Sequence, residues 1–297
     1  QITTRRIPNT PEVGQWTSGV LSYNWAKCGK MFLGECGELC NFVVMIEGKP
    51  QIAGETAREC AAVEAALYLF PVPLSDTSKV GDVLPGGNAG LLRHIRHFLV
   101  ENVRSARRFI KRVDPSIDVN RMVFTVLDEH TRTEEVEGML APLEAGEPMG
   151  IISEAGCPAV ADPGADAVAV AQRRGLKVVP LVGPSSILMA LMGSGFNGQS
   201  FAFNGYLPIE PPRRAAKLRE MENRIRRERQ TQIFIETPYR NNKLIAELAR
   251  TLPGQLRLCV ASDITGKGES IVSLPLSQWA KKNYDYGKVP TIFLLFN

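Results

Sequence analysis

The apolar run at 149–153 leads directly into a turn whose residue types could bind a cation or a sugar. Glu154 would place a carboxylate at the end of a strand, where it can meet ribose hydroxyls or a positive charge. Gly156 permits a positive φ or a close backbone approach. Asp162 precedes a proline and is predicted to be the N-cap of the next helix. The turn is therefore a candidate binding site at a strand end.

A second turn of this kind follows the apolar run at 177–181. Gly183 and Pro184 lead into Ser185 and Ser186 at the expected start of a helix. Backbone N–H groups and hydroxyls at a helix start can hold a carboxylate or a phosphate, although both serines could instead only cap the helix. Neither turn matches GxGxxG or GxxxxGK[ST], so the dinucleotide and P-loop interpretations lack their fingerprint.

A third strand end carries acidic and basic groups side by side. The run 232–236 ends in Glu236, and Thr237 before a proline is expected to cap the following helix. Glu236, Tyr239 and Arg240 are then left as polar groups at the strand end. Together the three turns indicate a cleft between two α/β halves, which is the usual place for a small-molecule site.

The elements that must position these turns follow the repeating pattern of an α/β protein. From residue 65 onward, short apolar runs alternate with amphipathic stretches, which is typical of a largely parallel sheet. The small and polar segment 193–199 indicates a boundary between a first domain over 65–197 and a second over 198–297. Strands are predicted at 66–72, 98–101, 122–127, 149–153, 177–181, 201–206, 232–236, 257–262, 270–273 and 291–296. Helices are predicted at 88–97, 104–112, 133–145, 163–174, 184–195, 212–229 and 240–251.

Residues 1–64 differ from the rest of the chain. They contain four of the six cysteines and show no sustained helical or strand period, so we predict no fold for them. Cys28, Cys36 and Cys40 match no standard ligand spacing, and three histidines in the chain add no metal motif. We therefore expect no metal site.

The charge distribution indicates a polyanionic partner. The chain has 35 basic and 31 acidic residues, and basic residues concentrate at 93–112 and 213–229. The alternative is that both stretches are solvated helix faces. No apolar run reaches the ~18 residues of a membrane helix and no leader opens the chain, so we expect a cytoplasmic protein with no membrane contact. The candidate substrate contacts are Arg104, Arg107, Arg108, Arg213, Arg214 and Arg240.

Three strings of the chain carry a family resemblance, in this order: SEAGCPAVADPG, PLVGPSS and FIETPYR. They resemble the patterns SDAGTPxxxDPG, PLPGPS and YESPHR of the tetrapyrrole methylase superfamily, most closely of its ribosomal RNA small subunit methyltransferase I group. The match runs from about residue 65 to the C-terminus. It implies two α/β domains, with a mainly parallel first sheet and a mixed second sheet. It also implies S-adenosylmethionine (SAM) as cofactor, bound between the domains of a subunit that is usually a homodimer.

The resemblance also implies roles for individual residues. Cys157 stands where the family has Thr, and Glu154 stands where the family usually has Asp. By strand-end position alone, Glu101 and Glu236 are candidates for a general base. The cofactor contacts implied are Leu74, Glu154, Ala155, Gly156, Cys157, Ser185, Ser186, Tyr206 and Leu207.

The predicted function is 2′-O-methylation of a ribose in small-subunit ribosomal RNA, with that RNA or the small ribosomal subunit as partner. One alternative is methylation of a tetrapyrrole or another small metabolite. The other is a SAM-binding or RNA-binding factor with impaired catalysis, because Ser75 replaces a glycine of the group's first loop. Residues 1–64 have no counterpart in the family, which suggests an extra segment or a misassigned start.

Overall fold

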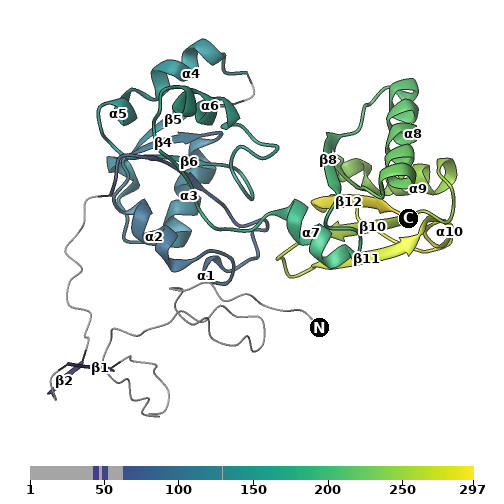
Figure 1. The fold of residues 1–297 in the computed structure, drawn as a ribbon, viewed down its shortest axis with the longest axis horizontal. Helices are drawn as coiled ribbons and strands as arrows, with labels where there is room; N and C mark the ends of the chain where they lie inside the picture. The colour runs from purple at the N-terminus through teal and green to yellow at the C-terminus, as the bar shows by residue number, and fades with distance from the viewer. Residues whose placement is uncertain (1–42, 47–48, 53–62, 129) are drawn as a thin grey trace, which may run out of the picture. The chain divides into compact units, whose positions relative to one another are not determined.

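The structure is a computed structural model that describes residues 43–46, 49–52, 63–128 and 130–297. Its contacts divide the chain into two units, Gln1–Ala61 and Ala62–Asn297. In the first unit, strands β1 (Val43–Ile46) and β2 (Lys49–Ile52) pair antiparallel. The second unit holds both of the larger sheets (Figure 1). Outside the described residues lie Cys28, Cys36 and Cys40.

The first sheet has five parallel strands in the order β5-β4-β6-β3-β7, which confirms the predicted parallel sheet. Its strands are β3 (Leu67–Phe70), β4 (His97–Val100), β5 (Val123–Val126), β6 (Met149–Ile152) and β7 (Val178–Pro180). Each residue of β6 is buried, because helices cover both faces of a parallel sheet. Gly150 in β6 is required by packing, since a Cβ there would lie 2.5 Å from the Phe98 ring.

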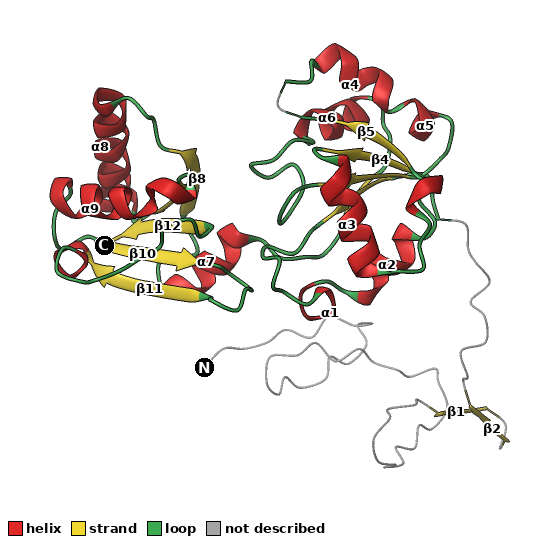
Figure 2. Ribbon diagram, turned by 180° about the vertical axis from the view of Figure 1, so that it is seen from behind, coloured by secondary structure: helices red, strands yellow, loops and turns green. Residues whose placement is uncertain are grey.

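Two apolar clusters show which helices cover which face of this sheet. One cluster joins buried side chains of the sheet with those of α2 and α3, and partly buried side chains of α1 pack against it. The other joins them with α4, α5 and α6. Figure 2 shows the two groups on opposite sides of the sheet. The helices are α1 (Val80–Val83), α2 (Gly86–Leu92), α3 (Val103–Val113), α4 (Thr133–Met139), α5 (Ala141–Glu144) and α6 (Ala165–Arg173), with a 3₁₀ turn η1 (Val119–Arg121) before β5.

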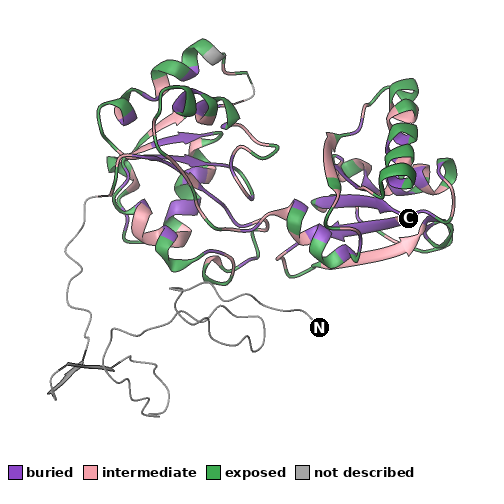
Figure 3. Cartoon of the chain, viewed as in Figure 1, coloured by how far each residue is buried: buried purple, intermediate pink, exposed green. Residues whose placement is uncertain are grey.

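The second sheet has the order β11-β10-β12-β9-β8 and is mixed, as predicted. The pair β8 and β9 is parallel, and the other pairs are antiparallel. Strands β10 and β12 are almost wholly buried (Figure 3). The elements are β8 (Phe201–Tyr206), β9 (Thr231–Ile235), β10 (Arg257–Ser262), β11 (Ser270–Pro275), β12 (Thr291–Phe296), α7 (Ser186–Ser194), α8 (Pro211–Glu228), η2 (Pro238–Arg240), α9 (Asn241–Thr251) and α10 (Leu276–Trp279).

Helix α7 belongs by packing to the second sheet, although it precedes the predicted domain boundary. Its buried residues Ile187, Ala190 and Leu191 join the apolar cluster of that sheet. A glycine on its far end, Gly193, would place a Cβ 2.7 Å from Ile271 of β11. The loop that precedes α7 is therefore fixed at one end by the first sheet and at the other by the second.

Three local predictions were wrong. The helix predicted over 88–97 ends at Leu92, because His97 already pairs with the neighbouring strands as the first residue of β4. The helix predicted over 133–145 is divided at Leu140. Pro142, in the first turn of α5, has no N–H to donate and so cannot continue the hydrogen bonds of α4. Asp162 is not an N-cap, since α6 begins only after Gly164 at φ 122°. Among the described residues, no helix is long and apolar enough to cross a bilayer.

Candidate functional site

The loops that follow β3, β6 and β7 are joined to one another by hydrogen bonds. These three strands are neighbours in a parallel sheet, so their carboxyl ends meet at one edge. Val72 and Gly156 exchange two backbone hydrogen bonds of 2.8 and 2.9 Å. The Cys157 Sγ donates to the Pro184 carbonyl at 3.4 Å. The two bends singled out in the sequence, 154–157 and 183–186, therefore lie together.

Two glycines allow this close approach. Gly156 has φ 74°, and a Cβ there would lie 3.1 Å from Leu74 Cδ2 and 3.6 Å from the Pro184 carbonyl oxygen. A Cβ at Gly183 would lie 2.2 Å from Pro71 Cβ, which is closer than real Cβ atoms come to other atoms. A side chain at Gly183 would therefore push the loops apart, whereas a side chain at Gly156 would be strained by the positive φ.

Three carboxylates gather at the ends of β4 and β6. Glu154 accepts a hydrogen bond from the Ser105 hydroxyl, which lies in the first turn of α3. Burial, reinforced by the negative charges of Glu101 and Glu154, raises the pKa of Asp162 to about 6. The Asn102 side chain caps α3 and so fixes the turn that carries Ser105. This edge of the sheet is negatively charged and suits a cationic ligand.

Ser185 occupies the N-cap of α7, and its hydroxyl accepts from the Leu188 N–H at 3.5 Å. The capping interpretation therefore holds for this serine. Ser186 is the first residue of the helix and is half-buried. Helix α7 starts directly after the Pro184 carbonyl that Cys157 contacts, so its first turn, with N–H groups that have no partner within the helix, lies next to the same loops.

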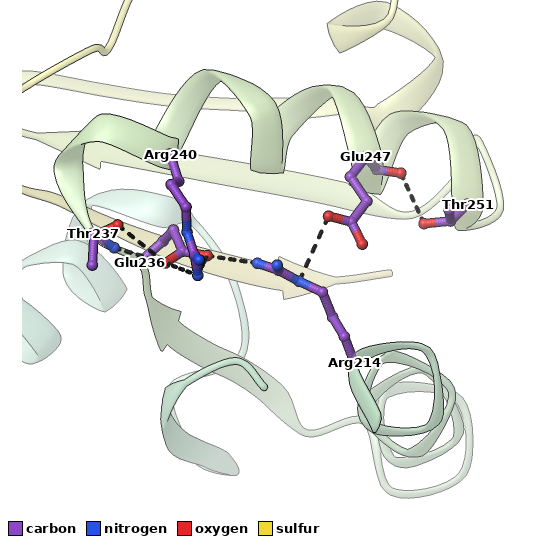
Figure 4. Close-up of polar contacts among 6 residues, drawn as sticks. All are labelled: Arg214, Glu236, Thr237, Arg240, Glu247 and Thr251. Atoms are coloured by element: carbon purple, nitrogen blue, oxygen red, sulfur yellow. Dashed lines mark hydrogen bonds and ion pairs between the residues drawn. The ribbon is translucent and has the colours of Figure 1, made fainter. Parts of the chain in front are cut away.

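Glu236 is the centre of a buried ionic cluster, shown in Figure 4. Arg240 donates to both of its carboxylate oxygens at 2.8 and 2.9 Å, Arg214 donates at 2.5 Å, and the Thr237 N–H donates at 2.8 Å. Burial alone would raise the pKa of Glu236, but the Thr237 N–H and the two guanidinium groups hold it below its ordinary value. A carboxylate held in this way is a weak base, so Glu236 is poorly suited to accept a proton.

The same cluster changes the interpretation of two arginines. The Arg214 side chain is only 11% exposed and lies 3.6 Å from Glu247 as well, so it is committed to the protein interior. Arg240 is anchored to Glu236. Arg213, one residue before Arg214, stays exposed at the start of α8. Of the arginines proposed for substrate binding, Arg214 and Arg240 therefore have a structural partner already.

The other candidate residues lie on exposed surfaces or in the core. Arg104, Arg107 and Arg108 are exposed on α3. Tyr206 ends β8 and is 63% exposed, whereas the neighbouring Leu207 is 2% exposed and packs into the core of the second sheet. The Leu207 side chain is thus part of that core. No group of His, Cys, Asp and Glu in the described residues could hold a metal ion.

Two features of this site were not predicted from the sequence, namely Ser105 and the position of Asp162 beside other carboxylates. An Asn followed three residues later by Ser, directly after an apolar strand, is a signal for Ser105, because that spacing marks the first turn of a helix at a strand end. Asp162 gave the opposite signal, since an Asp before a proline resembles a cap. Its proximity to Glu101 and Glu154 depends on tertiary structure that no local pattern encodes.

A cavity lies at the opposite edge of the first sheet. It measures about 610 Å³ and is lined by residues that precede β4 and β5, among them Arg93, Arg96 and Arg121. None of the bend residues lines it. The joined loops remain the better candidate site because they combine close backbone approach, a helix start and carboxylates at the carboxyl edge, where open parallel sheets bind ligands.

Comparison with curated proteins finds relatives with a common name. No family model matches the chain. A protein named ribosomal RNA small subunit methyltransferase I from Vibrio cholerae is 28% identical over 212 residues, which are 71% of this chain and 69% of that protein. Proteins of the same name from Pseudomonas aeruginosa and Escherichia coli O157:H7 are 33% and 24% identical, over 52% and 78% of their own lengths.

The solved structures agree at the level of the fold. The methyltransferase CobJ matches with a TM-score of 0.54 at 13% identity, over 78% of this chain and 94% of CobJ. A conserved hypothetical protein from Aeropyrum pernix K1 matches with a TM-score of 0.53 at 15% identity, over 77% of this chain and 83% of that one. The chain is thus similar in sequence to proteins named ribosomal RNA small subunit methyltransferase I and has a fold like that of the methyltransferase CobJ. Within this fold, the joined loops occupy the carboxyl edge of the parallel sheet.

The pKa of Asp162 predicts a pH dependence of stability. An Asp with a folded-state pKa of about 6, against 3.8 when unfolded, stabilises the fold at low pH, and this contribution is lost as the pH rises from about 4 to 6. Because the group is only half-buried, we expect the loss to be about 1–2 kcal/mol. Asp162→Asn should gain that much stability relative to wild type between pH 4 and pH 7.5, measured by urea unfolding.

The matched control is Glu228→Gln at the exposed end of α8. It should follow the wild-type pH profile within about 0.5 kcal/mol. If Asp162→Asn also follows the wild-type profile, Asp162 does not titrate as assigned.

Proposed function

We propose that the chain is a SAM-dependent methyltransferase that methylates a ribose 2′-hydroxyl in small-subunit ribosomal RNA. The observation that carries the proposal is the joining of bends 154–157 and 183–186 by the Cys157 contact, in a chain whose sequence relatives bear that enzyme's name. The assignment of a ribosomal RNA substrate rests on those relatives.

The residues around the joined loops fit the chemical groups of SAM. The molecule carries an ammonium and a sulfonium, for which Glu154 and Asp162 supply negative charge. It carries a carboxylate, for which the first N–H groups of α7 and the hydroxyls of Ser185 and Ser186 are suited donors. Gly156 leaves room for close contact with the backbone, and Leu74 lies directly against it. We propose these residues, with Ala155 and Cys157, as the SAM site.

The work of the protein in this reaction is alignment. SAM supplies an activated methyl group, so the residues must hold it in line with the acceptor oxygen and exclude water. Positioning of this kind contributes on the order of 7–11 kcal/mol. The rigid links between the loops, above all the Val72–Gly156 bridge and the Cys157–Pro184 contact, serve this purpose because they fix three strand ends relative to one another.

A ribose hydroxyl must lose its proton during the transfer. A base works best when its pKa lies near the working pH. Asp162, with a pKa of about 6, meets this requirement, and Glu101 lies within electrostatic range of it. We therefore propose that the carboxylates at the ends of β4 and β6 accept this proton. Asp162→Asn would then lower kcat while it stabilises the fold, a combination that a merely structural residue does not produce.

The exposed arginines of α3 and α8 are proposed to contact RNA phosphates. Arg104, Arg107 and Arg108 lie on one helix and Arg213 at the start of the other, each exposed. Binding to a single strand should weaken with salt, with a slope of about −0.7 for each phosphate contacted. Arg107→Gln should lower that slope by about one contact in a fluorescence titration, and an unchanged slope would remove Arg107 from the interface.

Tritiated SAM tests the function directly. Wild-type protein is incubated with small-subunit RNA alone, with assembled small subunits and with a precorrin-type tetrapyrrole, and label is counted in each acceptor. The proposal predicts label in RNA or subunits, resistant to alkali at one 2′-O-methylated position. Label in the tetrapyrrole instead would favour the metabolite alternative, and SAM binding without transfer would favour the impaired factor. A homodimer and a cytoplasmic location stay predictions of the same proposal.

A further inference from the structure

Two tyrosines stand exposed at the same edge of the second sheet. Tyr206 ends β8 and is 63% exposed, and Tyr239 lies in η2 directly after β9 and is 76% exposed. Strands β8 and β9 are parallel neighbours, with Tyr206 paired in register with Ile235. Both rings therefore belong to the carboxyl edge of adjacent strands. Ile209, 69% exposed, follows Tyr206 on the way to α8.

The backbone before Tyr206 is irregular, and this irregularity changes the direction of the Tyr206 side chain relative to the strand. The pairing of β8 with β9 shifts register between Phe203 and Tyr206, and Gly205 in between has φ 63°. A bulge of this kind redirects a side chain at the end of a strand and is common next to binding sites. Tyr206 is thus directed by the local backbone and is not covered by a neighbouring element.

The segments that carry Tyr239 and Arg213 are held in position by contacts with buried Glu236. Buried Glu236 holds Arg240, the residue after Tyr239, through both carboxylate oxygens. It also holds Arg214, the residue after Arg213. One carboxylate therefore fixes both the turn that displays Tyr239 and the start of α8 that displays Arg213 (Figure 4). The surface is pre-organised, which lowers the entropy cost of binding a flexible partner.

We propose that Tyr206, Ile209, Tyr239 and Arg213 form a stacking platform for the unpaired bases of a single-stranded RNA segment. Exposed aromatic rings beside cationic side chains match the two chemical parts of a single strand, since bases stack on the rings and phosphates pair with arginine. The exposed arginines that continue along α8 extend the positive surface past the platform. The platform rests on the proposed function and specifies which surface receives the RNA. It also moves Tyr206 from the expected cofactor contacts to the acceptor.

The test measures binding of a fluorescein-labelled single-stranded oligoadenylate of about 12 nucleotides by anisotropy, with an RNA duplex of the same length as comparison. The variants are Tyr206→Leu and Tyr239→Leu, each with its Phe counterpart. Each Leu variant should weaken single-strand binding by about 5- to 150-fold, while Phe, which keeps the ring, should bind as wild type does. Phe201→Leu is the matched control, because Phe201 is a partly exposed aromatic at the opposite end of β8.

Calorimetry with S-adenosylhomocysteine on the same variants separates the two roles of Tyr206. The platform predicts unchanged affinity for this compound in each of them. The platform is wrong if wild type fails to bind the single strand, if the Leu variants bind it as wild type does, or if Tyr206→Leu loses only S-adenosylhomocysteine. Methyl transfer to RNA is measured separately for wild type and for the Leu variants. Transfer by wild type tests the proposed function. Undiminished transfer by the Leu variants would overturn the platform and leave the proposed function standing.

Discussion

Gly183→Ala is expected to lower the affinity for S-adenosylhomocysteine by about 10- to 100-fold. The added methyl group would lie 2.2 Å from Pro71 Cβ and 2.6 Å from Pro71 Cγ, and a proline ring has no rotamer that could clear the space. The bend must therefore move, and the Pro184 carbonyl that accepts from Cys157 moves with it. A displacement near 1 Å in a positioned site can cost about 100-fold in rate, and we expect a loss of affinity of up to that size. Isothermal titration calorimetry measures the change.

The stability of the same variant should fall by about 1–3 kcal/mol, the usual cost of overpacking. Gly138→Ala is the matched control, because Gly138 lies in α4 with no atom within 4 Å of its would-be Cβ. That control should keep wild-type affinity and gain up to about 1 kcal/mol of helix stability. Wild-type affinity in folded Gly183→Ala would show that the bend at 183–186 does not contact the cofactor.

Glu236→Gln is expected to destabilise the protein by about 3–5 kcal/mol at neutral pH. Removal of one partner of a buried ion pair leaves the other charge uncompensated, and here Arg240 would lose its counter-ion while Arg214 would keep only the more distant Glu247. The Nε atoms of both arginines already lack a hydrogen-bond partner, because even the Glu247 carboxylate lies 3.6 Å from the Nε of Arg214. Chemical denaturation gives the change in the free energy of unfolding.

Glu220→Gln serves as the control, because Glu220 pairs with Lys217 and Arg224 on the exposed face of α8 and should cost no more than about 1 kcal/mol. The lowered pKa of Glu236 gives a second readout. Its stabilising contribution is present above the unfolded-state pKa and is lost as the pH falls through the folded-state value, so wild type and Glu236→Gln should converge in acid. A loss under about 1 kcal/mol at pH 7 would contradict the buried cluster.

Short apolar runs made several strands of the sheets predictable from the sequence. Strands β8, β10 and β12 begin and end where predicted, because each is bounded by turn residues and carries β-branched or aromatic side chains that a sheet interior accepts. The bends 154–157 and 183–186 were predicted as candidate sites for a related reason. A short turn between a buried strand and a helix places its residues at the sheet edge whatever the rest of the chain does.

Sequence patterns did not predict contacts between residues that are far apart in the chain. Nothing near Glu236 indicates that Arg214, 22 residues earlier, reaches its carboxylate. Asp162 resembled a cap because an Asp before a proline usually is one, yet the helix starts later and the side chain lies near other carboxylates instead. In both cases a residue that is ordinary in its local context acquires its role from a partner brought by the fold.

A crystal structure of the protein with S-adenosylhomocysteine tests the central claim most directly. We expect the compound to lie against Glu154, Gly156 and Cys157, with its amino-acid end toward the first turn of α7 at Ser185 and Ser186. A ligand bound elsewhere, for example in the arginine-lined cavity before β4 and β5, or no ligand bound to well-ordered loops at saturating concentration, would contradict it.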